Sequence, residues 1–212
     1  LVDFNRQDRV TYEMIYAGLA AEIEGEALTP AGQAKLMKIR QLTGGFYYKG
    51  AGGQDAIFSS DQVKIKELDD LLDELGLEQS VIWANFRAEI DMIAELLTKK
   101  GKKYGIIDGR TKDASVLIDM FQCGALDCII CHPAAAGHGI TLTSASYAIY
   151  YSMDFSYERY QQSRDRIHRK GQDRPCTYYH IVVDNTVDES ILWAVRNKAK
   201  MSDAVLRMLG QD

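Results

Sequence analysis

The chain lacks any long apolar run. No stretch of its 212 residues approaches the roughly 20 consecutive apolar residues that a membrane-spanning helix requires. It also lacks a secretory signal, because its first residues, Leu1-Val-Asp-Phe-Asn-Arg6, are mixed and polar. We therefore expect no membrane partner. The first methionine is Met14, from which we expect the sequence to be part of a longer protein.

Cysteine is scarce, and its use in a chain without a secretory signal favours a reducing compartment. The four cysteines are Cys123, Cys128, Cys131 and Cys176. Three of them, together with His132, have a spacing that loosely resembles a zinc site. However, residues 127–131 are typical of a buried strand, in which Cys128 and Cys131 would point to opposite faces. We expect buried thiols and no metal site.

An excess of positive charge is also missing. The chain has 25 Lys and Arg against 30 Asp and Glu, a net charge of −5, so any contact with DNA must be local. Residues 156–181 are the exception, with six Arg or Lys against three Asp or Glu. Such a run is usually a solvated helix face, and the alternative here is a local anion-binding surface.

The first part of the chain is predicted to be helical. Residues 5–25 and 30–42 form two predicted helices, separated near Pro30, which is favoured in a first helical turn. Residues 43–60 contain five glycines and little periodicity, which predicts a loop. Val63 to Leu75 is amphipathic and helical, and it ends at Gly76.

From residue 80 onward, short apolar runs alternate with helical windows. This alternation indicates an α/β fold with a parallel sheet and helices on both faces. We expect three parts: a helical extension (1–79), the sheet domain (80–185) and a last helical part (186–212), which Thr186 and Glu189 would open as a capping box. The predicted strands are 80–84, 104–107, 127–131, 147–151 and 177–183, and the predicted helices are 87–99, 113–122, 156–169 and 187–209.

A glycine-containing loop follows the predicted strand 127–131. Gly137 and Gly139 permit positive φ and close backbone approach, and Thr141 and Thr143 supply hydroxyls. Because ligands gather at the carboxyl ends of parallel strands, this loop could offer N–H groups to a phosphate. The alternative is an ordinary turn between two strands.

The most informative stretch runs from Gln162 to Gln172. Gln162, Arg166 and Arg169 are spaced i, i+4 and i+7, which puts them on one face of a helix. Two neighbouring guanidinium groups stay charged and match phosphate oxygens in geometry, so they suit a triphosphate. We interpret His168, between them, as a partly buried hydrogen-bonding residue.

The order of these segments resembles the second RecA-like lobe of superfamily-two helicases, specifically of SWI/SNF-type DNA translocases. The resemblance covers residues 80–209 well and the first 79 residues more loosely. The matching positions are Asp108, Gly109 and Thr111 of an Asp-Gly-x-Thr signature, Gly137, Gly139, Leu142 and Thr143 of the fifth motif, and Gln162, Arg166, Arg169, Gly171 and Gln172 of the sixth.

The chain departs from the family pattern in places. Ala136 stands where many relatives have glycine, and Thr141 where asparagine is frequent. Asp154-Phe-Ser-Tyr157 replaces a common Trp-Asn-Pro stretch, which favours a bacterial or phage-like branch over eukaryotic nucleosome remodelers. We therefore expect a cytoplasmic, nucleoid-associated protein, or a nuclear one if the source is eukaryotic.

The resemblance implies a P-loop NTPase-like lobe that closes an ATP site together with a first lobe. It implies that Arg166 and Arg169 act as arginine fingers and that Gln162 orients groups near the γ-phosphate. The other implied site residues are Gly137, Gly139 and Asp165 for ATP binding or coupling, and Asn85, Thr111, Thr141 and Thr143 for DNA phosphates.

Two motifs of such motors are missing from the sequence. There is no Gly-x-x-x-x-Gly-Lys-Ser/Thr phosphate loop and no Asp-Glu-x-His run. ATP and Mg²⁺ are therefore expected to be bound mainly by the first lobe of the same polypeptide, and these residues alone should be inactive as an ATPase. The implied partner is double-stranded DNA, bound independently of sequence through phosphate contacts.

Other interpretations stay open. The chain could be a lobe of a strand-separating DNA or RNA helicase, although the Arg-x-His-Arg-x-Gly-Gln ending favours the SWI/SNF type. It could be a non-catalytic adaptor, although an adaptor needs neither the two arginines nor the glycine loop. The last helix, with Trp193, Arg196 and Lys198, is either a brace toward the first lobe or a cap on the sheet.

Overall fold

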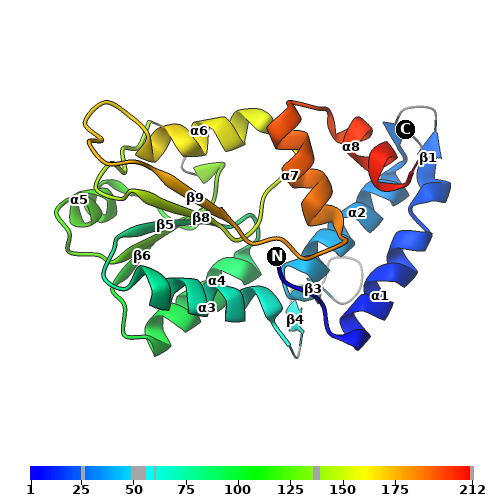
Figure 1. Cartoon of the computed structure of the whole chain (residues 1–212), viewed down its shortest axis with the longest axis horizontal. Helices are drawn as coiled ribbons and strands as arrows, with labels where there is room; N and C mark the ends of the chain where they lie inside the picture. Colours follow the sequence, from blue (N-terminus) through cyan, green and yellow to red (C-terminus); the bar gives the residue numbers. More distant parts are fainter. Residues whose placement is uncertain (25–26, 49–55, 60, 136–138, 211–212) are drawn as a thin grey trace.

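The computed structural model describes residues 1–24, 27–48, 56–59, 61–135 and 139–210. Helices and strands alternate from residue 63 onward, after a helical beginning (Figure 1). The helices are α1 (Arg6–Ala17), α2 (Pro30–Thr43), α3 (Val63–Leu75), α4 (Arg87–Lys99), α5 (Ser115–Gln122), α6 (Tyr157–Ile167), α7 (Val187–Asn197) and α8 (Met201–Met208), with a short 3₁₀ helix at Ala20–Glu22. The strands are β1 (Ile23–Glu24), β2 (Ala27–Leu28), β3 (Phe46–Tyr48), β4 (Ala56–Phe58), β5 (Ser80–Trp83), β6 (Tyr104–Ile107), β7 (Cys128–Cys131), β8 (Tyr147–Tyr150) and β9 (Thr177–His180).

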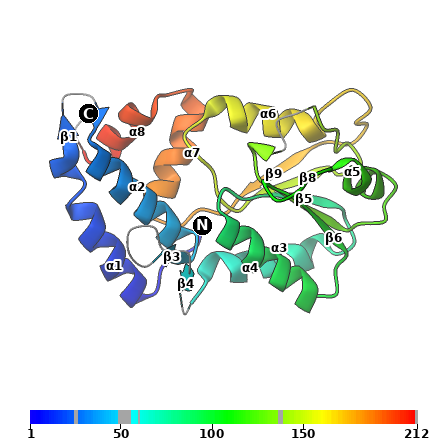
Figure 2. The ribbon, with the colours of Figure 1, turned by 180° about the vertical axis from the view of Figure 1, so that it is seen from behind.

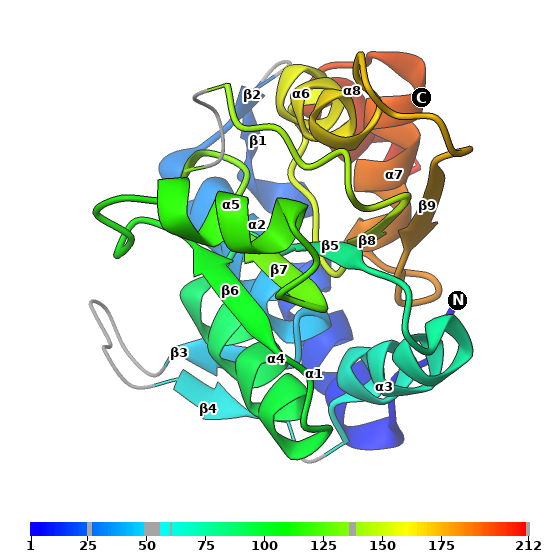
Figure 3. The same cartoon turned by 90° about the vertical axis from the view of Figure 1, so that its left-hand side faces the viewer.

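The predicted parallel sheet is confirmed. Five strands lie in the order β6-β7-β5-β8-β9, and every neighbouring pair is parallel. Helices α3 and α4 cover one face and α5 and α6 the other (Figure 3). The molecule therefore has the predicted RecA-like α/β architecture, with helices on both faces of the sheet.

Alternating side chains build a core on each face of the sheet. Ile82 packs with α3 and α4, whereas the adjacent Trp83, which is 1% exposed, packs with α5 and α6. Cys128 and Cys131 likewise belong to opposite cores, as the strand prediction required. Burial raises the pKa of the Cys131 thiol. Among the described residues, no cluster of three or more His, Cys, Asp or Glu could hold a metal ion.

The two ends of the chain pack together. Helices α1 and α2 lie beside α7 and α8, beyond the ends at which the sheet strands finish (Figure 1, Figure 2). We call these four helices the helical unit. Its core consists of Tyr12, Leu19, Leu36, Ile39, Val187, Ile191 and Val205. Residues that the sequence separates by some 150 positions thus share one apolar cluster.

A buried ion pair fastens the helical unit to the rest. Lys64 Nζ lies 2.5 Å from Asp188 Oδ2, and their side chains are 1% and 9% exposed. Lys64 also donates to the Tyr151 carbonyl at 3.1 Å, and Asp188 accepts from Thr43 Oγ1 at 2.9 Å and from the Val183 N–H at 3.2 Å. A buried charge is costly unless it is paired and hydrogen-bonded. The partners of Lys64 and Asp188 come from α2, α3, α7 and the chain next to the sheet, so the cluster joins these parts.

Outside the sheet domain, three predicted elements are wrong in extent. The helix predicted over 5–25 ends at Ala17, since the buried Leu19 turns the chain into the helical core. The predicted loop 43–60 contains the antiparallel strands β3 and β4. The helix predicted over 187–209 is broken, because Lys198 has a φ of 56° and the extended Lys200 is the N-cap of a new helix, α8.

The capping box at the start of α7 is only half formed. Thr186 Oγ1 accepts from the Asp188 N–H at 3.2 Å, as an N-cap should. Glu189 instead accepts from the Asn185 N–H. None of the helices in the described part of the chain has the length and apolarity needed to cross a membrane.

Candidate functional site

The arginine-bearing helix α6 is shorter than predicted. The Ser156 hydroxyl caps its start by accepting from the Arg159 N–H, and the helix ends at Ile167. His168 leaves the helical conformation, and Gly171, with a φ of 98°, completes the turn that follows. Arg169 therefore lies beyond the helix, so the prediction that it shares a helix face with Gln162 and Arg166 is wrong.

The structure nevertheless brings Arg169 to the glycine segment. Its Nη1 donates to Thr141 Oγ1 at 3.1 Å and lies 3.4 Å from the Gly139 carbonyl oxygen. In addition, the Leu142 N–H donates to the Arg166 carbonyl at 2.9 Å. The fifth-motif and sixth-motif segments, about 30 residues apart in sequence, are thus hydrogen-bonded to each other. We call residues 139–145 the motif segment.

The glycine prediction is tested at one position. Gly139 has a φ of 66°, a conformation that favours glycine, and a Cβ there would meet no atom of the described residues within 4 Å. Gly137 lies outside the described residues. An open, left-handed glycine next to Arg169 leaves room for a ligand to approach the backbone.

The remaining predicted residues of α6 are exposed. Gln162 and Asp165 both face solvent, and Asp165 accepts from Gln161 Nε2 at 2.9 Å on the same helix. His168 is exposed too, so its interpretation as partly buried is wrong.

Thr143 is engaged within the protein. Its Oγ1 accepts from Gln122 Nε2 at 3.3 Å, and its carbonyl accepts from Gln172 Nε2 at 3.0 Å. Gln122 is the last residue of α5, which runs back from the end of β6 toward the start of β7. Thr143 therefore lies near the amino ends of the strands. Nothing in the local sequence around Gln122 indicated this contact.

The other two predicted DNA-contact residues lie at the opposite, carboxyl ends of the strands. Thr111 closes a turn: its hydroxyl donates to the Ile106 carbonyl at 3.0 Å and accepts from the Asp108 N–H at 3.1 Å. Asn85 follows β5, and its Nδ2 donates to the Ser152 carbonyl at 2.9 Å. The four predicted DNA-contact residues thus form two separate pairs.

A cavity of about 190 Å³ opens beside Asn85 and the Asp-Gly-x-Thr turn. His132 Nε2 lies 3.1 Å from the Asn85 carbonyl oxygen, and the exposed Arg87 begins helix α4. Arg110 also lines this cavity, although it is paired with Asp108 and Asp91. Sequence reasoning missed these basic groups, because the patterns around them are not distinctive.

A buried carboxylate underlies this region. Glu89 is fully buried, and its Oε2 accepts from Ser152 Oγ at 2.5 Å and from the N–H groups of Asn85 and Phe86 at 3.1 Å. Its Oε1 has no hydrogen-bond partner among the described residues. Burial raises the pKa of Glu89 to about 7, although the hydrogen bond from Ser152 and the charge of Lys64 act in the opposite direction.

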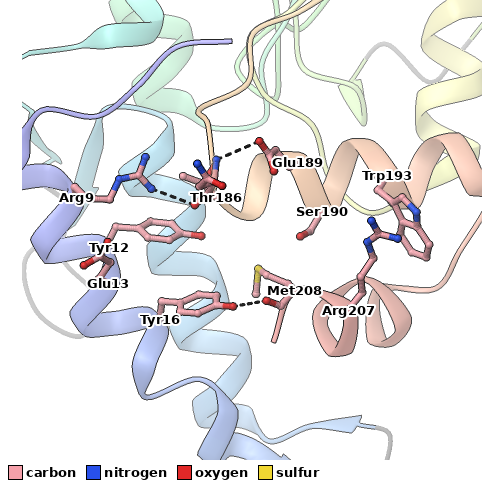
Figure 4. Close-up of a pocket in the computed structure, with 11 residues that line it drawn as sticks. Arg9, Tyr12, Glu13, Tyr16, Thr186, Glu189, Ser190, Trp193, Arg207 and Met208 are labelled. Carbon is pink, nitrogen blue, oxygen red and sulfur yellow. Dashed lines mark hydrogen bonds between the residues drawn. The ribbon is translucent and has the colours of Figure 1, made fainter. Parts of the chain in front are cut away.

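A larger cavity of about 470 Å³ lies elsewhere, between α1, α7 and α8 (Figure 4). Tyr16 donates from its hydroxyl to the Met208 carbonyl, and Arg207 lies over the Trp193 ring at 4.7 Å from its centroid. Trp193 is therefore only partly buried. The described residues that line this cavity include none of the motif residues.

Comparison with known sequences decides the family. The helicase conserved C-terminal domain matches residues 63–171, which is about half of the chain and includes both the motif segment and α6. The chain belongs to this family. It is similar to chromatin-remodeling ATPase INO80 of Aspergillus oryzae, with 32% identity over 157 residues that make up 72% of this chain and 11% of that protein. The corresponding protein of Mycosarcoma maydis is 32% identical over 151 residues, 69% of this chain and 8% of that protein.

A solved structure agrees with these relatives. The helicase C-terminal lobe described here is similar to the C-terminal part of the Fun30 ATPase domain, with a TM-score of 0.60 and 25% identity over 70% of this chain and 53% of that one. The predicted resemblance to the second lobe of SWI/SNF-type ATPases is confirmed. The chain spans about a tenth of the length of the curated relatives it matches. None of these comparisons supports the predicted bacterial or phage-like branch.

Proposed function

We propose that this helicase C-terminal domain is the second motor lobe of an ATP-dependent double-stranded DNA translocase. The observation that carries the proposal is the connection between the sixth-motif arginines and the motif segment. Arg169 contacts Thr141 through its side chain, and Arg166 contacts Leu142 through its main chain. Through these contacts, a phosphate bound by the two arginines would be connected to the motif segment. We assign this segment to the coupling of ATP hydrolysis to DNA movement.

The chemical role follows from charge. During phosphoryl transfer, negative charge spreads over the γ-phosphoryl oxygens, and a fixed guanidinium fork stabilises it. Arg169 lies at the surface next to an open glycine, so it can reach a nucleotide bound by another lobe. We assign Arg166 and Arg169 as arginine fingers, Gln162 to orientation near the γ-phosphate, and Gly137, Gly139 and Asp165 to coupling.

ATP and Mg²⁺ would be held mainly by the first lobe of the same polypeptide. The chain has no phosphate loop in its sequence, and its described residues form no acidic cluster that could hold a cation. The 212 residues alone should therefore hydrolyse no ATP. The chain supplies charge stabilisation and coupling, and the first lobe supplies the nucleotide site.

DNA contact is proposed to be independent of sequence. We assign Thr141 and Thr143 to one phosphate-contact region, and Asn85 and Thr111 to another. The hydroxyl of Thr111 and the amide of Asn85 are hydrogen-bonded internally, so the exposed Arg87 is added as the phosphate ligand in the second region. Replacing Arg87 by alanine should reduce the slope of log affinity against log salt concentration by about 1. For such a motor we expect the nucleus in a eukaryote and the nucleoid in a bacterium.

The function is tested in the full-length protein with Arg166→Ala. DNA-stimulated ATP hydrolysis should fall by roughly 10³-fold or more, while the protein stays folded. Unchanged ATP turnover would show that Arg166 is not an arginine finger. A strand-displacement assay on the same protein separates a translocase, which releases no strand, from a strand-separating helicase. An inactive wild-type protein that still binds DNA would indicate an adaptor.

A further inference from the structure

The motif segment contains no helix and no strand. Its polar main-chain groups therefore depend on partners outside the sheet ladder. One main-chain bond, from the Leu142 N–H to the Arg166 carbonyl at 2.9 Å, joins it to α6. Leu142 and Ala145 are fully buried and anchor it to the core. Within the segment the Ala145 N–H lies 3.3 Å from the Leu142 carbonyl oxygen, and side chains hold several of the other main-chain groups.

The Gln172 side chain holds two main-chain carbonyls of the segment. Its Nε2 donates to the Thr143 carbonyl at 3.0 Å and to the Ala145 carbonyl at 2.7 Å, and it lies 3.4 Å from the Ile167 carbonyl. Its Oε1 accepts from the Arg174 N–H at 3.0 Å. A primary amide has two N–H donors and one carbonyl, and this one uses them all on main-chain groups. A single side chain thus joins the motif segment to the turn after α6.

A second amide holds the same segment from the other side. Gln122 Oε1 accepts from the Ser144 N–H at 2.9 Å, and its Nε2 donates to Thr143 Oγ1 at 3.3 Å. The motif segment is therefore held between the end of α5 and the end of α6. Both amides are neutral, and the exposed guanidinium of Arg174 also donates to the Ser144 carbonyl, at 2.5 Å.

We propose that Gln172 is a positioning residue for ATP hydrolysis, because it fixes the motif segment relative to the two arginines. The inference rests on the proposed function of those arginines. Arg169 contacts Thr141, two residues before the carbonyl that Gln172 holds, so movement of the segment changes the position of the guanidinium. A displacement of about 1 Å in such a group can lower a reaction rate by about 10²-fold.

The chain offers a matched control in Gln79. Its Nε2 also donates to two main-chain carbonyls, those of Phe121 at 2.8 Å and Leu126 at 2.7 Å. Gln79 is half-buried, as Gln172 is, and its own hydrogen bonds reach no described residue of the motif segment. The Phe121 carbonyl that it holds also accepts from Ser144 Oγ at 3.2 Å. Replacing either glutamine by alanine removes two hydrogen bonds from its Nε2 to main-chain carbonyls, and Gln172→Ala also removes the one from the Arg174 N–H. Only Gln172→Ala removes hydrogen bonds to the motif segment.

The experiment compares Gln172→Ala with Gln79→Ala in the full-length protein. Both should lower the melting temperature, Gln172→Ala somewhat more because it loses one more hydrogen bond. At saturating DNA, Gln172→Ala should lower kcat for ATP about 10-fold with KM changed less than about twofold, since the lost interaction acts on the transition state. Gln79→Ala should leave both constants within about twofold. Gln172→Glu, which places an oxygen against two carbonyls, should lower kcat further than alanine does.

A second measurement does not depend on turnover. Amide hydrogen exchange at Leu142 and Ser144 should become faster in Gln172→Ala and stay unchanged in Gln79→Ala. Equal kcat values for the two alanine variants, with Arg166→Ala inactive, would overturn the positioning role alone. A wild-type protein without DNA-stimulated turnover would overturn the proposed function and the positioning role together.

Discussion

Two polar regions of this lobe use charge in opposite ways. Around the end of α6, the charged side chain of Arg169 is exposed and neutral glutamine amides hold the backbone. At the junction of the sheet with the helical unit, Lys64, Asp188 and Glu89 are buried and hold one another or main-chain groups. Charge that stays in water is available to a ligand, whereas buried charge is committed to structure.

The largest effect expected from this difference is catalytic. Arg169→Ala in the full-length protein should lower ATP turnover by roughly 10³-fold, and Arg169→Lys should recover only part of it because the ammonium lacks the guanidinium fork. Neither variant should shift the unfolding midpoint appreciably, since the side chain is exposed. Steady-state ATPase assays with saturating DNA measure the first quantity and thermal unfolding the second. ATP turnover within tenfold of the wild-type value would show that the exposed Arg169 does not act in catalysis.

The next effect concerns stability. Lys64→Met should lower the free energy of unfolding by about 3–5 kcal/mol, because it leaves the Asp188 carboxylate buried without its cation. Urea unfolding measures the change. The double variant Lys64→Met with Asp188→Leu should recover only part of the loss, since Thr43 and the Val183 N–H lose their acceptor. A loss of unfolding free energy below about 1 kcal/mol for Lys64→Met would show that the Lys64–Asp188 pair contributes little to stability.

The buried Glu89 should also make the stability of the fold depend on pH. The pKa of Glu89 is raised by burial from 4.5 to about 7, so the folded state favours the protonated form. Its contribution to stability is fully present below pH 4.5 and is lost as pH rises through about 7, a change on the order of 3 kcal/mol. Glu89→Gln should remove this dependence.

The titration of His180 also changes stability with pH, and comparing the wild type with Glu89→Gln removes this contribution. Burial also lowers the pKa of His180 to about 4, which makes stability rise with pH between about 4 and 6.5 in both wild type and variant. Subtracting the variant's unfolding free energy from that of the wild type at pH 5 and pH 8 therefore isolates Glu89. Equal differences at the two pH values would contradict the assignment.

The smallest effect is expected at His168. It lies between the two arginines in sequence, but its side chain is exposed at the end of α6. His168→Ala should change the free energy of unfolding by less than about 0.5 kcal/mol and leave kcat within about twofold. A tenfold loss of kcat would mean that the His168 side chain also contributes to catalysis.

The sheet and most of its helices could be predicted, because their patterns are local. The helices Val63–Leu75 and Arg87–Lys99 and the strand Tyr104–Ile107 have the predicted bounds, since each carries its own apolar periodicity. The end of α6 before Arg169 could not be predicted. A period of 3.6 continues through that sequence, and the turn at Gly171 depends on the contact of Gln172 with a distant segment.

The candidate site was predictable as a set of motifs but not as contacts. The pairing of Arg169 with Thr141, and the two glutamine amides, join segments that no local pattern connects. For the same reason the four DNA-contact predictions could not be divided into two regions from the sequence. The burial of Glu89 was hidden as well, because a glutamate in an amphipathic helix ordinarily faces water.

The shared core of α2 and α7 has a consequence for synthesis on the ribosome. Leu36 and Ile39 emerge well before Val187 and Ile191, the residues that cover them. At about 5–20 residues per second, that interval is on the order of 7 to 30 seconds. During this time the nascent helices keep an apolar face uncovered, which makes them a site for chaperone binding until Val187 and Ile191 are translated.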